Sequence, residues 1–303
     1  MVRRKTIGCK EAMNVLITGA TGFIGTHLTK LVAKEGHQVL AIGTKRNNVH
    51  MFGVQVHAIP LNEIGFFCED FEPDICINLA WYVNPVDYIH SKKNLDMMNA
   101  SIALASQLAK VNCARFVGVG TCLEYDISKG RLQEDSLIKP ECLYAAAKAA
   151  TFFCTSNMDL KDMSFAWVRP FYIYGPYEDR RRFVPTIINS ILKDDIAKCP
   201  KGNQLRDFLH VEDVASAIWA VAKSDLEGPV NIGSGYDARI DEIVATIQLL
   251  VNRYEDVHFE DYVRPPSIIA NTTLLNTIWQ PKYTLRSGLQ QTVEWWIHHP
   301  EAS

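Results

Sequence analysis

Short runs of apolar residues alternate with amphipathic stretches through the first half of the chain. The apolar runs are continuous rather than alternating, which is typical of strands covered on both faces of a sheet. They occupy residues 14–18, 38–42, 54–59, 75–80 and 115–120. Strands of this kind, separated by helical segments, predict an α/β fold built on a doubly wound parallel sheet.

The pattern changes near Gly175, where a Pro-punctuated and Arg-rich stretch follows the last apolar run. We expect one domain over residues 13–175, with residues 207–236 returning to it. A smaller C-terminal α/β lobe is expected over residues 176–303. The hydrophobic pattern begins only at Met13, so residues 1–12 are expected to form a loose extension.

Composition narrows the class of protein. The 303 residues are 48% hydrophobic and 21% charged, which excludes a disordered, collagen-like or coiled-coil chain. The net charge of −3 is too balanced for a surface that binds by neutralising many phosphates, so nucleic acid is not an expected partner.

The eight cysteines and the hydropathy bear on metal, redox state and location. No C-x-x-C pair and no Cys/His ligand spacing occurs, so we expect reduced packing cysteines and no metal site. No apolar stretch has the length of a membrane span, and the basic start lacks the apolar core of a signal peptide. These absences predict a cytoplasmic protein without a membrane partner.

A glycine triplet spaced three and three follows the first apolar run, at Gly19, Gly22 and Gly25. Between a strand and a helix, such glycines let the backbone approach a pyrophosphate, and the helix N-terminus then faces the negative charge. An ordinary tight turn is the alternative. We expect a dinucleotide site, and the loop residues expected to contact it are Gly19, Thr21, Gly22, Phe23 and Ile24.

The end of the second apolar run carries no acidic residue to accept hydrogen bonds from a ribose 2′-hydroxyl. It reads Thr44, Lys45 and Arg46, a small residue followed by two cations. This favours the 2′-phosphate of NADP, with NAD as the possible alternative cofactor. Two solvated surface charges would give the same sequence.

Tyr144 and Lys148 are spaced i and i+4, so on a helix they share one face. The ammonium is then expected to lower the pKa of the phenol and make it a usable acid and base. Thr121 follows the fifth apolar run, at the carboxyl end of a predicted strand, where ligands of parallel sheets bind.

From Met13 onward the chain resembles an extended short-chain dehydrogenase/reductase of the NAD-dependent epimerase/dehydratase family. The resemblance rests on the glycine loop, the Tyr144/Lys148 pair and four further motifs: residues 78–80 (NLA), 168–176 (VRPFYIYGP), 206–214 (RDFLHVEDV) and 231–235 (NIGSG). It implies a Rossmann sheet, a nucleotide-diphosphate-sugar substrate and cofactor contacts at Leu79 and Ala80.

The same resemblance implies roles for further residues. Thr121, Tyr144 and Lys148 would form the catalytic triad, with Asn94 in a supporting helix. The residues expected to bind the substrate are Thr121, Arg182, Arg206 and Arg264. A structural ion pair of Arg206 with Asp207 is the alternative for Arg206. Members commonly pair through two helices, and we expect a homodimer through residues 94–110 and 141–157.

The residues after Thr121 bear on the reaction. Dehydratases of this family place an Asp and a Glu there, whereas this chain has Cys122 and Leu123, with Glu124 one position later. Side chains of those two types cannot do the required acid–base work. We therefore expect NADPH-dependent reduction of a nucleotide-linked 4-keto-6-deoxy sugar. An NAD-dependent 4-epimerase and a catalytically silent dinucleotide-binding protein are the alternatives.

Overall fold

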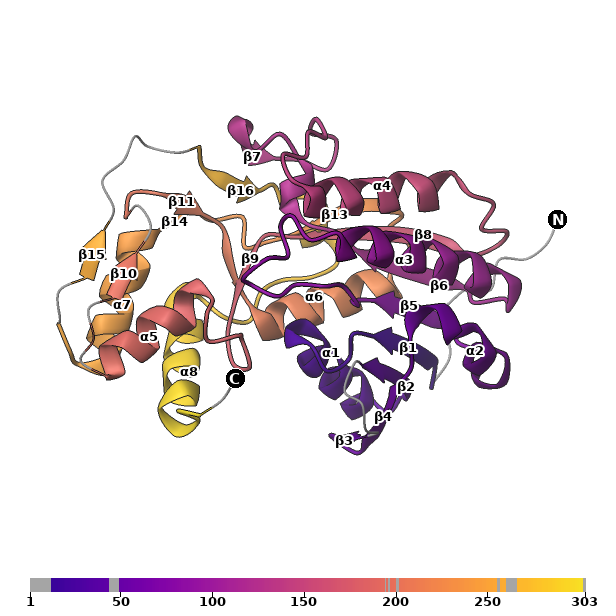
Figure 1. Cartoon of the computed structure of the whole chain (residues 1–303), viewed down its shortest axis with the longest axis horizontal. Helices are drawn as coiled ribbons and strands as arrows, with labels where there is room; N and C mark the ends of the chain where they lie inside the picture. Colours follow the sequence, from indigo (N-terminus) through magenta and orange to yellow (C-terminus); the bar gives the residue numbers. More distant parts are fainter. Residues whose placement is uncertain are drawn as a thin grey trace.

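The computed structural model describes residues 12–43, 49–193, 195, 197–199, 202–254, 257–259 and 266–301. Its centre is an eight-stranded sheet in which every neighbouring pair is parallel except β3 and β4 (Figure 1). In order across the sheet the strands are β13 (Gly228–Ile232), β8 (Ser164–Pro170), β6 (Arg115–Val119), β5 (Ile75–Asn78), β1 (Asn14–Thr18), β2 (Gln38–Gly43), β4 (Val54–Ala58) and β3 (Val49–Met51). The predicted doubly wound α/β fold is confirmed.

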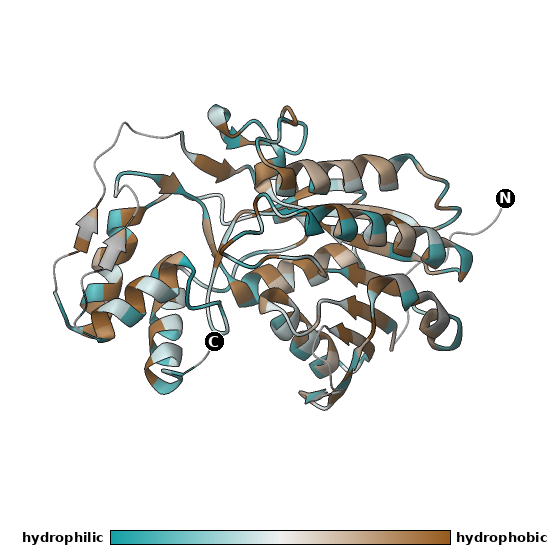
Figure 2. Cartoon of the chain, in the orientation of Figure 1, coloured by the Kyte–Doolittle hydropathy of each residue, from teal (hydrophilic) through white to brown (hydrophobic). Residues whose placement is uncertain are grey.

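Helices cover both faces of this sheet (Figure 1). On one face lie α1 (Phe23–Lys34) and α6 (Val211–Lys223); on the other lie α2 (Gly65–Phe71), α3 (Lys93–Lys110) and α4 (Leu143–Asn157). Successive residues of β1 point to opposite faces, so Ile17 packs in the α1/α6 core while Leu16 packs in the α3 core. In Figure 2 the central strands are accordingly hydrophobic, whereas the helices carry both kinds of residue.

The chain leaves this sheet after β8 and returns to it. α6 packs against α1, and β13 pairs in parallel with β8, with Val230 opposite Val168. Both α6 and β13 lie within residues 207–236, the range expected to return to the first domain. The limits of the two domains stay predictions.

A smaller lobe lies at the side of the sheet (Figure 1). Its own core joins Ile187, Ile243 and Trp296 from three helices. These helices are α5 (Phe183–Leu192), α7 (Ile240–Val251) and α8 (Leu285–His298). Its strands are β9 (Tyr172–Tyr174), β10 (Ala197–Cys199), β11 (Leu205–Arg206), β12 (Phe208–His210), β14 (Ala238–Arg239), β15 (Val257–Phe259) and β16 (Ile268–Ala270), and β16 also pairs with β7 (Gly130–Leu132).

Several elements lie where the hydrophobic pattern predicts none, among them the short elements β3 and α2. β3 forms a hairpin with β4, and α2 is a seven-residue helix in which Cys68 reaches the α3 core. Elements this short bury too few side chains to show a period. Among the described residues, no helix is long and apolar enough to cross a membrane. Of the expected N-terminal extension, residues 1–11 lie outside the described ranges.

Candidate active site

The glycine loop closes tightly between β1 and α1. Gly19 has φ +68°, and the Gly22 amide donates to the Gly19 carbonyl at 2.9 Å. A Cβ on Gly25 would lie 2.1 Å from the Gly19 oxygen, so no side chain fits there. Among the described residues no side chain caps α1 at Gly22, which leaves N–H groups of its first turn available to an anion. This cradle fits a dinucleotide pyrophosphate.

Two neighbouring segments border the loop. A Cβ on Gly19 would lie 2.8 Å from the Ala80 nitrogen, which itself donates to the Thr18 hydroxyl at 3.2 Å. At the end of β2, Gly43 leaves room for the Thr21 side chain. The structure therefore brings Thr21 and the Leu79–Ala80 peptide together around the cradle. Thr44, Lys45 and Arg46 lie outside the described residues.

Tyr144 and Lys148 lie on α4, buried beneath the carboxyl end of β6. The hydroxyls of Tyr144 and Thr121 share a hydrogen bond. The Lys148 ammonium donates to the Val119 carbonyl at 2.5 Å and lies 3.8 Å from the Trp81 ring centroid. The three residues expected to form the triad are thus adjacent.

The pKa of Tyr144 is not lowered as the i, i+4 spacing predicts. Burial raises it well above its usual value, and the Thr121 hydrogen bond only partly offsets that rise. Burial also lowers the pKa of Lys148 to about 7, opposed by the charge of Glu124. The physical reason is that desolvation disfavours both charged forms more than the neighbouring groups favour them.

Asn94 supports the site through a loop rather than by direct contact with the triad. Its side-chain oxygen accepts from the Trp81 ring nitrogen at 2.8 Å, and its amide donates to the Tyr88 carbonyl at 2.6 Å. The rings of Trp81 and Tyr88 in turn lie edge-on to Tyr144, at 6.4 and 5.0 Å between centroids. An aromatic wall held by Asn94 therefore borders Tyr144.

The expected substrate-binding arginines occupy different places. The Arg182 guanidinium lies 4.8 Å from the Tyr88 ring centroid and donates to the Val83 carbonyl at 3.0 Å, beside the aromatic wall. Arg206 lies 5.6 Å from the Tyr172 ring centroid and donates to the carbonyls of Leu205 and Pro266. Arg264 lies outside the described residues.

The alternative role for Arg206, an ion pair with Asp207, is not formed within the described part of the chain. The Asp207 carboxylate instead accepts from the amides of Ser234, Gly235 and Ala270 at 2.7, 2.9 and 3.1 Å. Asp207 thus joins the loop after β13 to β16 and leaves Arg206 directed elsewhere.

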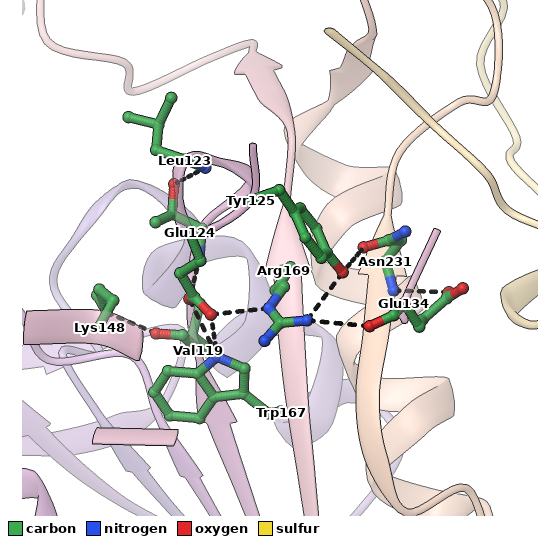
Figure 3. A network of polar contacts seen from close by, with 10 residues as sticks. Val119, Leu123, Glu124, Tyr125, Glu134, Lys148, Trp167, Arg169 and Asn231 are labelled. Atoms are coloured by element: carbon green, nitrogen blue, oxygen red, sulfur yellow. Dashed lines mark hydrogen bonds and ion pairs between the residues drawn. The ribbon is translucent and has the colours of Figure 1, made fainter. Parts of the chain in front are cut away.

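A buried polar network around Glu124 and Arg169 (Figure 3) also holds the backbone of Thr121. Glu124, which has no exposed surface, accepts from the Thr121 amide at 2.9 Å and from the Arg169 Nε at 2.7 Å. Arg169 also donates to the Tyr125 hydroxyl at 2.9 Å, and that hydroxyl donates to the Asn231 side chain at 2.8 Å. The network links the loop after β6 to β8 and β13.

No side-chain cluster of three His, Cys, Asp or Glu suited to a metal ion occurs within the described ranges. The seven described cysteines form no disulfide, and burial raises the pKa of Cys122, beside Thr121, to about 12. That thiol is a neutral packing group.

The fold, the glycine cradle and the Tyr/Lys pair together define a dinucleotide-dependent α/β enzyme class. A family model, the NAD dependent epimerase/dehydratase family, matches residues 15–233, and the chain belongs to that family. The chain is 26% identical to UDP-glucuronic acid decarboxylase 1 of Xenopus tropicalis over 96% of its own length and 74% of that protein.

Solved structures of the same fold include two UDP-glucose 4-epimerases. That of Thermotoga maritima, with UDP-glucose, has a TM-score of 0.84 at 18% identity and covers 95% of this chain and 100% of its own. That of Thermus thermophilus, in complex with NAD, has a TM-score of 0.81 at 22% identity over 94% and 99%. At such identities the likeness shows the fold.

The sequence gives no prediction for two features of the site. The Glu124–Arg169 pair joins residues 45 positions apart, and a buried Glu has no local mark that distinguishes it from a solvated one. The only sequence signal for this pair was Glu124 itself, which lies one position beyond the place where dehydratases of the family carry their Asp and Glu. Trp81 and Tyr88 lie in a loop without a period, and only their closeness to the NLA motif at residues 78–80 pointed to the site.

Proposed function

We propose that this protein reduces a nucleotide-linked 4-keto-6-deoxy sugar to the 4-hydroxy sugar with NADPH. Relatives named as acting on UDP-glucuronic acid, dTDP-glucose and GDP-mannose support a nucleotide-sugar substrate. Neighbours solved with UDP-glucuronic acid or UDP-glucose and NAD support the combination of substrate and cofactor at one site.

The observation that carries the proposal is the combination of a Tyr144–Thr121–Lys148 triad with a sequestered Glu124. Removal of a proton from the sugar C5 and loss of the 6-hydroxyl need an additional acid and base. Glu124 is bound to Arg169, Trp167 and the Thr121 amide, and Cys122 is a neutral thiol. Transfer of one hydride and one proton is the chemistry that these groups support best.

Each residue of the triad has a defined part in this reaction. The nicotinamide, when bound, supplies the hydride. Tyr144 donates a proton to the oxygen of the keto carbon, and its raised pKa keeps that proton in place until the alkoxide develops. Thr121 hydrogen-bonds the same oxygen, and Lys148 orients the cofactor ribose.

NADPH is proposed over NADH because of Lys45 and Arg46. They follow Gly43, which abuts the Thr21 side chain of the cradle, so they are two and three residues beyond the edge of the dinucleotide site. Charge-assisted hydrogen bonds to a 2′-phosphate are worth about 1.5–3 kcal/mol each. Replacing both by Ala should weaken NADPH roughly 10²-fold or more, with NADH little changed; equal losses for both cofactors would reject the NADP preference.

A 4-epimerase that retains NAD is the second candidate, favoured by the NAD in solved epimerase neighbours. Its chemistry uses the same three residues without net reduction. The first experiment is therefore to identify the nucleotide released when the purified protein is denatured. Tightly held NAD favours the epimerase, and loose or absent NADPH favours the reductase.

Turnover then decides between the candidates. With a nucleotide-linked 4-keto-6-deoxyhexose, a reductase consumes one NADPH for each sugar reduced. An epimerase interconverts 4-hydroxy sugars with no net change in cofactor absorbance and no added NADPH. A catalytically silent protein does neither, and that result would reject both enzyme functions.

A further inference from the structure

The Glu124 carboxylate is held from three directions, as Figure 3 shows. The Thr121 amide donates to the carboxylate from the preceding loop. The Trp167 ring nitrogen donates to its two oxygens at 3.1 and 3.2 Å, and the Arg169 Nε donates to it at 2.7 Å. A Cβ on Gly120 would lie 2.2 Å from its Oε1, so glycine there makes the approach possible. Both charged partners have at most 1% of their side-chain surface exposed.

Burying such a pair is costly. Two charges removed from water lose hydration that their mutual attraction often does not fully restore, and apolar residues of similar volume frequently stabilise a core better. Burial acts to lower the pKa of Arg169, yet the Glu124 charge and the Tyr125 hydrogen bond raise it above its usual value, so the guanidinium stays charged. Burial also raises the pKa of Glu124, and the Arg169 charge and the hydrogen bonds from Thr121 and Trp167 offset that rise only in part. Fold stability alone is therefore a weak reason for the pair to stand beside the triad.

The pair instead defines the position of Thr121. Thr121 caps the short 3₁₀ helix Cys122–Glu124: its hydroxyl accepts from the Leu123 amide at 3.3 Å, while Glu124 holds its own amide. A threonine hydroxyl has one proton to donate. Leu123 occupies one of the two oxygen lone pairs, so the proton and the second lone pair remain for Tyr144 and for the reacting oxygen.

The charge of Glu124 also reaches the other two members of the triad. Besides burial, the groups that act on Tyr144 are Tyr88, Thr121, Glu124 and Cys122, and Glu124 is the charge that acts on Lys148. Its sign is the same at both: it favours the phenol over the phenolate and the ammonium over the amine.

We propose that Glu124 is a positioning residue: it orients the Thr121 hydroxyl through the backbone, and its carboxylate is the negative charge that acts on Tyr144 and Lys148. The kinetic part of the test below rests on the proposed function. The contact of Glu124 with the Arg169 chain of hydrogen bonds holds it against the strands β8 and β13.

The test compares Glu124→Gln with Glu134→Gln. Glu134 is a matched control, because its carboxylate accepts from the Asn231 amide at the far end of the same network. Lys148 is titrated by NMR of ¹³Cε-labelled lysine, with Lys148→Met used to assign its resonance. We expect its midpoint at lower pH in Glu124→Gln than in the wild type, and unchanged in Glu134→Gln.

Kinetics supply the second readout. Loss of the carboxylate lowers the pKa of both Tyr144 and Lys148, so the basic limb of the kcat profile should move to lower pH. We expect kcat to fall about 10-fold or more, with KM changed much less, since the loss concerns groups that act on the reacting oxygen. Glu134→Gln should keep the wild-type limb and KM.

A second variant separates position from charge and guards against misfolding. Glu124→Asp keeps a carboxylate opposite Arg169 but is one methylene too short to hold the Thr121 amide. It should lower kcat while leaving the Lys148 midpoint near the wild-type value. Either of two results would overturn the proposal and assign Glu124 to the fold alone. The first is a Glu124→Gln protein in which neither the Lys148 midpoint nor the basic limb of the kcat profile moves. The second is loss of cooperative unfolding in both Glu124 variants.

Failure of the proposed function gives a different pattern. If the wild type epimerises rather than reduces, the same kinetic comparison applies to epimerisation. If it turns over neither substrate, the proposed function fails, and the Lys148 titration still decides the proposal about Glu124.

Discussion

Tyr144 is buried, and its hydroxyl hydrogen-bonds Thr121, so mutation can test the two hydroxyls one at a time. Tyr144→Phe removes the proton donor and keeps the ring against Tyr88. It should lower kcat about 10²–10⁴-fold, the usual contribution of one positioned acid, while cofactor binding stays nearly intact.

Thr121→Val is the matched comparison, because it removes one hydrogen bond to the reacting oxygen and no proton carrier. Its kcat should fall by about 10²–10³-fold at most, less than for Tyr144→Phe. Steady-state kinetics with saturating cofactor measures both. A Tyr144→Phe protein with wild-type kcat would remove Tyr144 from the chemistry.

The lowered pKa of Lys148 predicts that cofactor binding depends on pH. Burial lowers its pKa to about 7, so in the free enzyme the ammonium is present below that pH and is lost as the pH rises through it. If Lys148 holds the cofactor ribose, NADPH affinity should fall across this range. Fluorescence titration of NADPH binding between pH 6 and 9 measures this fall in affinity. These limits lie about 1 unit below and about 2 units above the pKa of Lys148.

Lys148→Met is the control for that titration. It should bind NADPH more weakly and without the step near neutral pH. An identical step in Lys148→Met would place the titrating group elsewhere.

At the scale of elements, the turn between β1 and α1 depends on backbone contact that only glycine permits. In Gly25→Ala the new Cβ meets the Gly19 oxygen and the Ala20 backbone, neither of which is the end of a flexible side chain. The loop must shift at a cost of about 1–3 kcal/mol, which should weaken dinucleotide binding roughly 5- to 150-fold.

Gly36→Ala, at the other end of α1, provides the control. Gly36 has φ +87° and no atom within 4 Å of an added Cβ, so the substitution strains the backbone without touching the cradle. It should lower the melting temperature and leave cofactor affinity unchanged. Equal affinities for Gly25→Ala and Gly36→Ala would show that the loop does not hold the dinucleotide.

For the whole molecule we predict a homodimer through α3 and α4. Several apolar residues within the two ranges expected at this interface are buried inside the subunit, among them Leu104, Ala145 and Ala149. Phe153 remains 48% exposed on α4, beside Phe152, which packs on the sheet residue Phe165. The outward face is therefore narrower than the helical runs alone suggested.

Phe153→Asp should dissociate that dimer, because a charge on an apolar interface loses its hydration. Leu249→Asp is the control, since Leu249 is 49% exposed on α7 of the other lobe. Sedimentation at micromolar concentration measures both. A wild type that sediments only as a monomer would contradict the prediction.

The sequence by itself determined the parallel doubly wound fold, the alternating strands and helices of its first half, the glycine loop and the i, i+4 spacing of Tyr144 and Lys148. Each of these depends on neighbours along the chain: continuous apolar runs, glycines at fixed spacing, or an i, i+4 relation. β3 and α2 were not predicted, because elements of three and seven residues are too short to show a hydrophobic period.

Tertiary structure alone decided the electrostatics of the site. Whether Lys148 lowers the pKa of Tyr144 depends on how completely both are buried, and around them lie the end of β6 at Val119 and the loop at Trp81. The role of Glu124 likewise follows from Trp167 and Arg169, more than 40 residues away. Burial and long-range pairing are properties of the packed chain, and no local pattern of residues encodes them.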